Sequence, residues 1–212
     1  MDTIISPFQS SFIKGRTIQD NIIVSQEIVM KRSRGRKGLM ALKIDLEKAY
    51  DHDRIQWDFL EKVLEEVGFD SNFINLIMAC VTTVSYNVLW NGSMTLFSSA
   101  HKGLRQGDPI SPFLFVLCVD KLSHMICDEV GSSAWKPIFL ANSGPAVSHL
   151  MFADDVLLFG EATEKQARCM IKCLAKFCLM SGSKVSKEKS SVFFSPRVLV
   201  SVKQNINTIT GM

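Results

Sequence analysis

Two consecutive aspartates, Asp154 and Asp155, stand between two apolar arms, and no other feature constrains the fold of this chain as strongly. The arms are Leu150–Phe152 on one side and Val156–Phe159 on the other. Short apolar runs of this kind predict buried strands, so we expect a tight hairpin with the acids at its tip. Two like charges at such a turn repel each other, and burial favours their protonation. A bound cation would offset that cost.

A third acid, Asp45, closes the apolar run from Leu39 to Ile44, which also predicts a buried strand. A sheet formed by these strands can bring Asp45 alongside Asp154 and Asp155. Oxygen ligands without convergent His or Cys favour Mg²⁺ or Mn²⁺ over zinc. Three carboxylates can hold two such ions roughly 3.5–4 Å apart, the arrangement used in phosphoryl transfer. On spacing alone, a solvated Asp-Asp turn with Asp45 as a helix cap is an equal alternative.

A glycine-bounded polar loop, 103–109, leads directly into an apolar helix. Ser111 as N-cap and Pro112 at the first helical position predict where that helix starts. The residues that follow are apolar on nearly all sides, which predicts a buried helix. Backbone can approach a ligand closely at glycine, and a helix N-terminus favours anions. The alternative is an ordinary loop of turn residues.

Three amphipathic helices are also expected. The first covers 59–67 and ends at Gly68, and the second covers 71–79. The third follows a capping box formed by Thr163 and Gln166 and ends at Gly182.

The remaining strand signals complete an α+β pattern. Asn91-Gly92, between Tyr86–Trp90 and Met94–Phe97, predicts a hairpin with a type I′ turn. Ser191–Phe194 adds a strand, and the tail from Ser195 is expected to be partly disordered. Strand, helices, hairpin and helix in this order are typical of a split βαβ sheet.

Composition limits the class of protein without selecting a function. The 212 residues are 47% hydrophobic and 21% charged, which fits one globular domain, and the net charge of +3 permits a polyanionic partner without requiring one. The six cysteines form no Cys-x-x-Cys pair, which argues against zinc and for a reducing, intracellular compartment. We expect no signal peptide and no membrane span. The basic run 31–37 is expected to be a solvated loop, with phosphate contact or nuclear import as alternatives.

Several stretches in order resemble one family, the LINE-type (non-LTR) retrotransposon reverse transcriptases, and plant-like ones in particular. These stretches are the segment SPFQSSF with Gly15-Arg16 and Asp20-Asn21, LKIDLEKAYD at 42–51, GLRQGDPISPFLF at 103–115, FADD at 152–155, and 182–190. A lone Asp-Asp box is weak evidence, whereas four ordered motifs are specific.

The resemblance implies a polymerase palm, with a small antiparallel, RRM-like sheet packed on helices and with partial fingers. The domains expected on this basis are a partial fingers or pre-palm segment over 1–38, the palm over 39–195, and a tail over 196–212 that stops before the thumb. The remaining fingers, the thumb and an endonuclease region are expected in a parent polyprotein.

The resemblance also implies roles for individual residues. Asp45, Asp154 and Asp155 would hold two Mg²⁺ ions, with Mn²⁺ as a possible substitute. The backbone amides of Leu46, Glu47, Lys48 and Ala49 would contact the nucleotide phosphates. Tyr50 would be the gate whose ring crowds a ribose 2′-hydroxyl.

Other residues would shape the substrate site. Gln106 and Gly107 would wall the pocket around the nucleotide, with Arg105 as a nearby phosphate or template contact. Lys189 is the candidate general acid for pyrophosphate, with a solvated lysine as the alternative, and Arg16 is a candidate template contact. The implied partners are an RNA template, a DNA primer and deoxynucleoside triphosphates, in the cytoplasm or, as the family favours, the nucleus.

One departure from the family pattern follows the first motif. His52-Asp53 adds two residues where relatives read Asp-Arg-Val-x-Trp, and two residues rotate a helix by about 200° unless a loop bulge absorbs them. The hypotheses are therefore an RNA-directed DNA polymerase fragment, a catalytically inactive retrotransposon remnant that at most binds nucleic acid, and another two-metal enzyme. The last does not explain Tyr50 or the Gln106-Gly107 loop.

Overall fold

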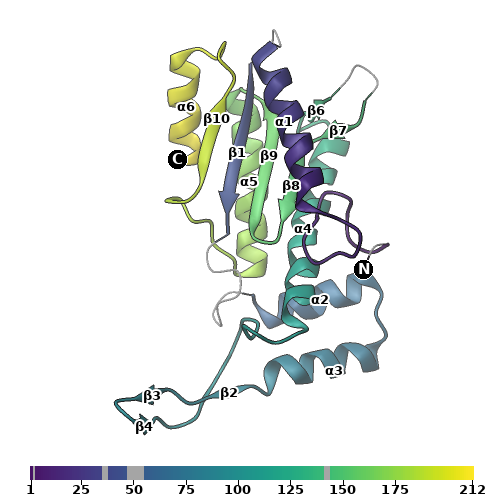
Figure 1. The fold of residues 1–212 in the computed structure, drawn as a ribbon, viewed down its shortest axis with the longest axis vertical. Helices are drawn as coiled ribbons and strands as arrows, with labels where there is room; N and C mark the ends of the chain where they lie inside the picture. The colour runs from purple at the N-terminus through teal and green to yellow at the C-terminus, as the bar shows by residue number, and fades with distance from the viewer. Residues whose placement is uncertain (2, 35–37, 47–54, 141–143) are drawn as a thin grey trace.

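The centre of the protein is a four-stranded antiparallel sheet. In the computed structural model, which describes residues 1, 3–34, 38–46, 55–140 and 144–212, the strand order is β10-β1-β9-β8 (Figure 1). The strands are β1 Leu39–Asp45, β8 His149–Phe152, β9 Asp155–Glu161 and β10 Ser191–Phe194. Strands β1 and β8 have β9 inserted between them, which is the split βαβ arrangement. The predicted fold class is confirmed.

Alternation along the central strand β1 explains how one face of the sheet is buried. Met40, Leu42 and Ile44 are fully buried in the main core, whereas Lys43 and Asp45 point to the opposite face. Because side chains alternate along a strand with period two, the same seven residues build a core and present polar groups.

Two helices, α4 Ser111–Gly131 and α5 Glu164–Ser181, cover the core face of the sheet (Figure 1). The predicted N-cap of α5 is confirmed, since the Thr163 side chain accepts a hydrogen bond from the Gln166 N–H. The Gln166 side chain does not complete a capping box; it accepts from the Lys136 N–H and donates to the Ala134 carbonyl. It therefore ties α5 to the segment that follows α4.

Helix α1, Ile18–Arg34, lies across the opposite face of the sheet, over β8 and β9 (Figure 1). Ile28 anchors it in a second, smaller core with Ala41, Leu150 and Phe159. The expectation of a loop for the basic run is wrong for residues 31–34, which continue the helix. Lysine and arginine are good helix formers, so a helix docked at Ile28 can extend through them.

Helices α2 Trp57–Val67 and α3 Ser71–Thr82 lie beyond the end of the sheet, near the start of α4. Gly68 ends α2 with a left-handed backbone at φ +88°, as predicted. The Trp57 indole donates to the Gly103 carbonyl over 2.9 Å, which fixes the start of the polar loop to α2.

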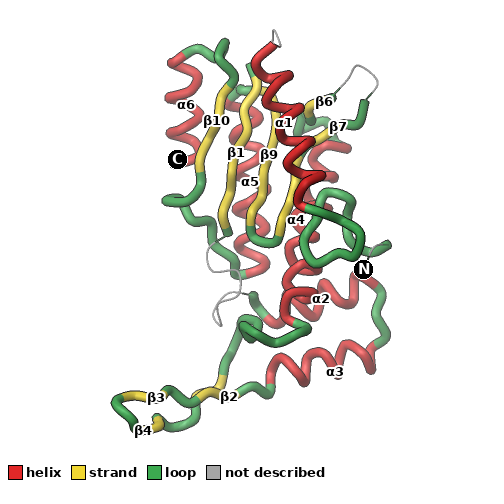
Figure 2. Tube along the Cα trace, viewed as in Figure 1, coloured by secondary structure: helices red, strands yellow, loops and turns green. Residues whose placement is uncertain are grey.

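A narrow arm projects away from the body of the protein (Figure 2). It consists of the pair β2 Ser85–Tyr86 and β5 Ser98–Ser99, followed outward by β3 Leu89–Trp90 and β4 Ser93–Met94. Asn91 and Gly92 both have positive φ, +49° and +82°, which is the type I′ turn predicted from the sequence. A further short pair, β6 Ile138–Phe139 and β7 Ala146–Val147, was not anticipated.

The C-terminal tail is ordered, so the expectation of partial disorder is wrong. Helix α6, Val200–Thr210, packs against α5 and buries Ile206 completely. Val202, Ile206 and Ile209 recur at helical spacing, which supplies the apolar face that docks. Within the part of the chain that the structure describes, no helix is long and apolar enough to span a membrane.

Candidate active site

Three acidic residues from two separate parts of the chain lie at one end of the sheet. Asp45, the last residue of β1, is paired directly with Asp155, the first residue of β9. The Leu46 N–H donates to the Asp154 carbonyl over 3.1 Å, so the chain leaving β1 is fastened to the tip of the β8–β9 hairpin. The backbone thus brings together the three acids singled out in the sequence.

The hairpin that carries the acids turns within two residues. Phe152 pairs with Asp155, leaving Ala153 and Asp154 at the tip. Ala153 has φ +54°, a left-handed backbone that is unfavourable for a residue with a Cβ atom. Strained backbone of this kind persists only where surrounding contacts hold it.

The carboxyl group of Asp154 is in an unfavourable position for a negative charge. Burial raises its pKa most, and the charges of Asp155 and Asp45 raise it further. A backbone hydrogen bond and the charge of Lys189 act in the opposite direction. The pKa of Asp154 is therefore above its ordinary value, because burial and the neighbouring acids together outweigh the backbone hydrogen bond and the charge of Lys189.

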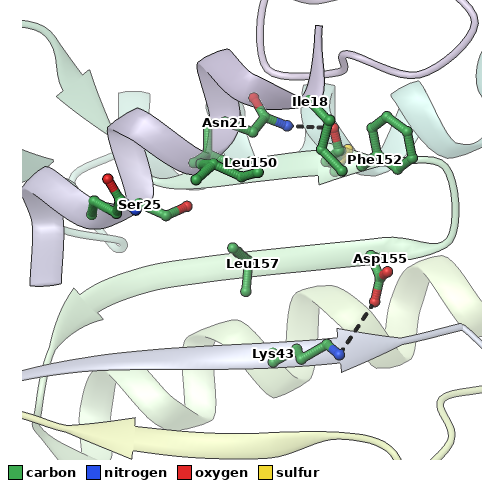
Figure 3. A pocket seen from close by; sticks show the side chains of 11 residues that line it. Ile18, Asn21, Ser25, Lys43, Leu150, Phe152, Asp155 and Leu157 are labelled. Carbon is green, nitrogen blue, oxygen red and sulfur yellow. Dashed lines mark hydrogen bonds and ion pairs between the residues drawn. The ribbon is translucent and has the colours of Figure 1, made fainter.

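Two lysines flank the acids, one on each outer carboxylate. Lys189 Nζ lies 3.9 Å from Asp45 Oδ1, and Lys43 Nζ lies 3.8 Å from Asp155 Oδ1 (Figure 3). Lys189 was predicted from the sequence, whereas Lys43 was not. The signal was present in the alternation of β1, because Lys43 stands two residues before Asp45 and shares its face of the sheet.

The segment before β10 positions Lys189. The Ser186 N–H donates to the Asp45 carbonyl over 2.9 Å, and the Asp45 N–H donates to the Ser190 hydroxyl over 3.1 Å. These bonds pin residues on both sides of Lys189 to the end of β1. Lys189 itself is well exposed, so its pairing with Asp45 is weak and easily exchanged.

The carboxylates of Asp45, Asp154 and Asp155 are chemically suited to a divalent cation, although their side chains are not arranged as a metal-ligand group. Carboxylate oxygens are the ligands that Mg²⁺ and Mn²⁺ prefer. Burial, and then the neighbouring acids, raise the pKa of Asp154, and a bound cation would offset that cost. Among the described residues, no three His, Cys, Asp or Glu side chains form a ready-made metal-ligand group. Metal binding would require Asp45 and Asp155 to exchange their lysine partners for the ion.

The predicted phosphate-contacting segment is described only at its start. Leu46 is buried and forms a bridge with Val185. Residues Glu47, Lys48, Ala49 and Tyr50 lie outside the described residues, as does the departure at 52–53.

The loop that contains Arg105, Gln106 and Gly107 is exposed at the start of α4, toward the same end of the long axis as the hairpin tip (Figure 1). Gly107 has φ +86°, which glycine adopts without strain. Helix α4 begins one residue earlier than predicted, at Ser111 with Ile110 as N-cap. The earlier start of the helix has a local cause, since the Asp108 carboxylate accepts a hydrogen bond from the Ile110 N–H at 3.0 Å.

Arg16 makes contacts within the chain. Its guanidinium donates to the carbonyls of Ser6, Ile5 and Gln9, the last at 2.8 Å. These bonds hold the N-terminal loop in a compact form. Contact between Arg16 and template stays a prediction.

A cavity of about 700 Å³ lies between α1 and the open face of the sheet (Figure 3). Its walls are mostly apolar, with Ile18 and Ile22 from α1 facing Leu150 and Leu157 from the sheet. Asp155 lines the cavity together with Lys43, so this hollow opens beside the acids.

A split βαβ sheet with acids at the end of its first strand and at the tip of its hairpin defines the palm of the nucleic-acid polymerases. The fold is similar to telomerase from Candida tropicalis, with a TM-score of 0.63 and 14% sequence identity over 89% of this chain and 30% of that chain. A family model described as "Reverse transcriptase (RNA-dependent DNA polymerase)" matches residues 1–208. The chain belongs to the reverse transcriptase family.

The curated relatives include retrotransposon proteins. The chain is 26% identical to the transposon TX1 uncharacterized 149 kDa protein of Xenopus laevis, over 89% of this chain and 14% of that protein. It is 28% identical to the Pol polyprotein of the type-1 retrotransposable element R2 of Popillia japonica, over 67% of this chain and 22% of that polyprotein. The resemblance to non-LTR elements is confirmed, and the chain spans less than a quarter of either protein.

Proposed function

We propose that this chain is the palm portion of an RNA-directed DNA polymerase that extends a DNA primer on an RNA template. The observation that carries the proposal is the direct pairing of Asp45 with Asp155, with Asp154 fastened beside them. Membership of the reverse transcriptase family supplies the reaction class. Deoxynucleoside triphosphates are the proposed substrates.

The three aspartates are proposed to hold two Mg²⁺ ions, for which Mn²⁺ can substitute. The chemistry that such ions supply is activation of the primer 3′-hydroxyl and neutralisation of charge on the triphosphate and departing pyrophosphate. The strands support this proposal, because the last residue of β1, Asp45, pairs through the backbone with Asp155, and Asp154 is hydrogen-bonded beside them.

Residues around the acids would bind and orient the nucleotide. Lys189, held next to Asp45, is proposed to act as the general acid that donates a proton to the departing pyrophosphate. Gln106 and Gly107 are proposed to shape the nucleotide pocket, with Arg105 beside them. The amides of 46–49 are proposed to contact phosphates, and Tyr50 to exclude ribonucleotides.

Primer extension tests the proposal directly. Purified protein is mixed with Mg²⁺, a DNA primer annealed to RNA, and deoxynucleoside triphosphates, and the products are separated by length. We expect extension that disappears in Asp154→Asn and persists in Asp58→Asn, which removes an exposed carboxylate on α2. Extension by Asp154→Asn at the unmodified rate would exclude the proposed site.

The second candidate function is a nucleic-acid-binding remnant without catalysis. The specific observation in its favour is that Asp45 and Asp155 each face a lysine and that the described acids form no preassembled ligand group. Binding of the primed template without extension, in Mg²⁺ and in Mn²⁺, would support this candidate over the polymerase.

A further inference from the structure

Gln9 is a polar residue with no exposed surface, in the segment that precedes α1. The backbone around it runs parallel to β8 as a short additional edge. The Met151 N–H donates to the Phe8 carbonyl over 2.8 Å, and the Ser10 N–H donates to the Met151 carbonyl over 3.1 Å. The N-terminal segment thus pairs with the sheet three residues before Asp154.

The side chain of Gln9 reaches the turn that carries the acids. Its Oε1 atom accepts the Ala153 N–H at 3.2 Å and the Ser11 N–H at 2.9 Å. Two backbone donors aimed at one atom identify that atom as the amide oxygen. Ala153 is buried and its N–H donates to Gln9, so a side chain without an acceptor at position 9 would leave this donor without that hydrogen bond.

The turn is therefore held from two sides. The Gln9 amide oxygen binds the N–H of its first residue, Ala153, and the Leu46 N–H binds the carbonyl of its second residue, Asp154. The contact with Gln9 stabilises the left-handed backbone at Ala153, on which the direction of both following carboxylates depends.

The N-terminal segment is itself fixed, so Gln9 has little freedom to leave the turn. Arg16 donates to the Gln9 carbonyl over 2.8 Å. Asn21 donates to the Met151 carbonyl over 3.0 Å (Figure 3). It also accepts from the Ser10 hydroxyl at 2.9 Å. These bonds join α1, the segment and β8 into one unit.

The NH₂ group of the Gln9 side chain makes no comparable hydrogen bond to the described residues. Its Nε2 atom is buried without a hydrogen-bond partner among the described residues. An unpaired buried donor is unfavourable, so packing alone would be served better by an apolar side chain of the same size. The feature that an apolar side chain cannot supply is the acceptor for Ala153.

We propose that Gln9 is a positioning residue, which sets the conformation of the 153–154 turn and through it the placement of Asp154 and Asp155. Its importance for chemistry rests on the proposed polymerase function. Its control of the turn does not, and the two can be measured separately.

Hydrogen exchange at the Ala153 amide, followed by NMR, measures control of the turn. In the unmodified protein we expect this amide to be strongly protected. Gln9→Met, which keeps the size but removes the acceptor, should raise its exchange rate at least about tenfold. Gln9→Glu keeps a carboxyl oxygen for the N–H groups and should restore most of the protection.

Ser6→Ala provides the matched control. It removes a different, partly buried contact of the same segment, the hydrogen bond that the Ser123 hydroxyl donates to the Ser6 hydroxyl. This variant should lower the melting temperature while leaving Ala153 protected. Two results would overturn the proposal: an Ala153 amide that exchanges rapidly in the unmodified protein, or one that loses its protection in Ser6→Ala. Both results can be obtained even if Gln9→Met fails to fold.

Mn²⁺ affinity, measured by electron paramagnetic resonance, links the turn to the acids. Gln9→Met should weaken Mn²⁺ binding about tenfold while Ser6→Ala leaves it unchanged, as expected for a group that orients ligands. Unchanged Mn²⁺ affinity in Gln9→Met, with the turn released, would limit Gln9 to a structural role and overturn the positioning of the acids. If the unmodified protein binds no Mn²⁺, the proposed function fails, and the exchange data alone decide the role of Gln9 in the turn.

Discussion

Asp45 and Asp155 lie directly opposite each other, at the last position of β1 and the first position of β9. Directly paired residues of antiparallel strands have neighbouring side chains on the same face, and like charges there destabilise the sheet. The protein places a lysine beside each of them. The arrangement is thus a pair of like charges that is compensated locally by two lysines.

The first prediction concerns the ligands themselves. Asp45→Asn or Asp155→Asn should weaken Mn²⁺ binding by at least about tenfold, because each removes a charged ligand from an oxygen-only site. Titration followed by electron paramagnetic resonance measures this affinity. Asp58→Asn should leave it unchanged, and equal affinity in all three variants would place the ion elsewhere.

The second prediction concerns Lys43. Lys43→Met should strengthen Mn²⁺ binding by about two- to fivefold, since it removes a positive charge that competes for Asp155, in a partly exposed pair of modest energy. Lys136→Met is the control, because Lys136 pairs with Glu161, which is at the other end of β9 from Asp155. Weaker binding in Lys43→Met would show that Lys43 supports the site instead of competing for it.

The position of the acids could be predicted from the sequence because it depends on local signals. Apolar arms around Asp154-Asp155 define a hairpin, and an apolar run ending at Asp45 defines a strand. That β1 and β9 are neighbours was an expectation from the sequence, and the sheet order confirms it. The type I′ turn at Asn91-Gly92 was predictable for the same reason, since it depends on two adjacent residues.

Features that depend on tertiary contacts could not be predicted in this way. Helix α6 is stable because Ile206 docks on α5, and its sequence by itself resembles a mixed tail. Helix α4 begins one residue earlier than predicted because the Asp108 carboxylate accepts a hydrogen bond from the N–H of Ile110, the N-cap residue. The contact of Gln9 with Ala153 joins residues 144 positions apart in the sequence, so no local pattern could predict it.

The third prediction uses the buried histidine of β8. His149 is fully buried between the hydroxyls of Ser123 and Ser148, at 2.7 and 2.9 Å, and burial lowers its pKa from 6.5 to about 3. Between pH 6.5 and pH 3, His149 is therefore protonated in the unfolded chain and neutral in the folded protein. Stability is fully present above pH 6.5 and is lost as the pH falls toward 3.

Denaturant unfolding at pH 7 and pH 5 measures this effect. His149 should account for a loss of about 2 kcal/mol between these values. His149→Gln should be less stable at pH 7 but should lack this part of the pH dependence, whereas His101→Gln, which replaces an exposed histidine, should retain it. An undiminished slope in His149→Gln would contradict the assignment.

The fourth prediction concerns Tyr50, which lies outside the described residues and whose role rests on the family resemblance. If its ring crowds the ribose 2′-hydroxyl, Tyr50→Val should admit ribonucleotides in any active form of this domain. The measurement is the ratio of kcat/KM for a deoxynucleotide and the matching ribonucleotide. Unchanged discrimination would remove Tyr50 from the sugar gate.

The fifth prediction concerns the projecting arm. Residues 71–100 contain no Asp, Glu, Lys or Arg, and the arm exposes large apolar side chains, with Leu96 at 91% and Trp90 at 70% of their full accessibility. Uncharged strands with exposed apolar side chains and open edges favour pairing with other chains. We therefore expect the protein to self-associate through the arm as its concentration rises.

Charged residues on the arm should suppress this association. Leu89→Lys combined with Leu96→Lys should shift the onset of association, followed by light scattering or sedimentation velocity, to at least about tenfold higher concentration, because a charge at each position opposes strand pairing. Leu179→Lys is the matched control, since Leu179 is also highly exposed but lies on α5, away from the arm. An equal shift in Leu179→Lys would mean that net charge, and not the arm, governs solubility.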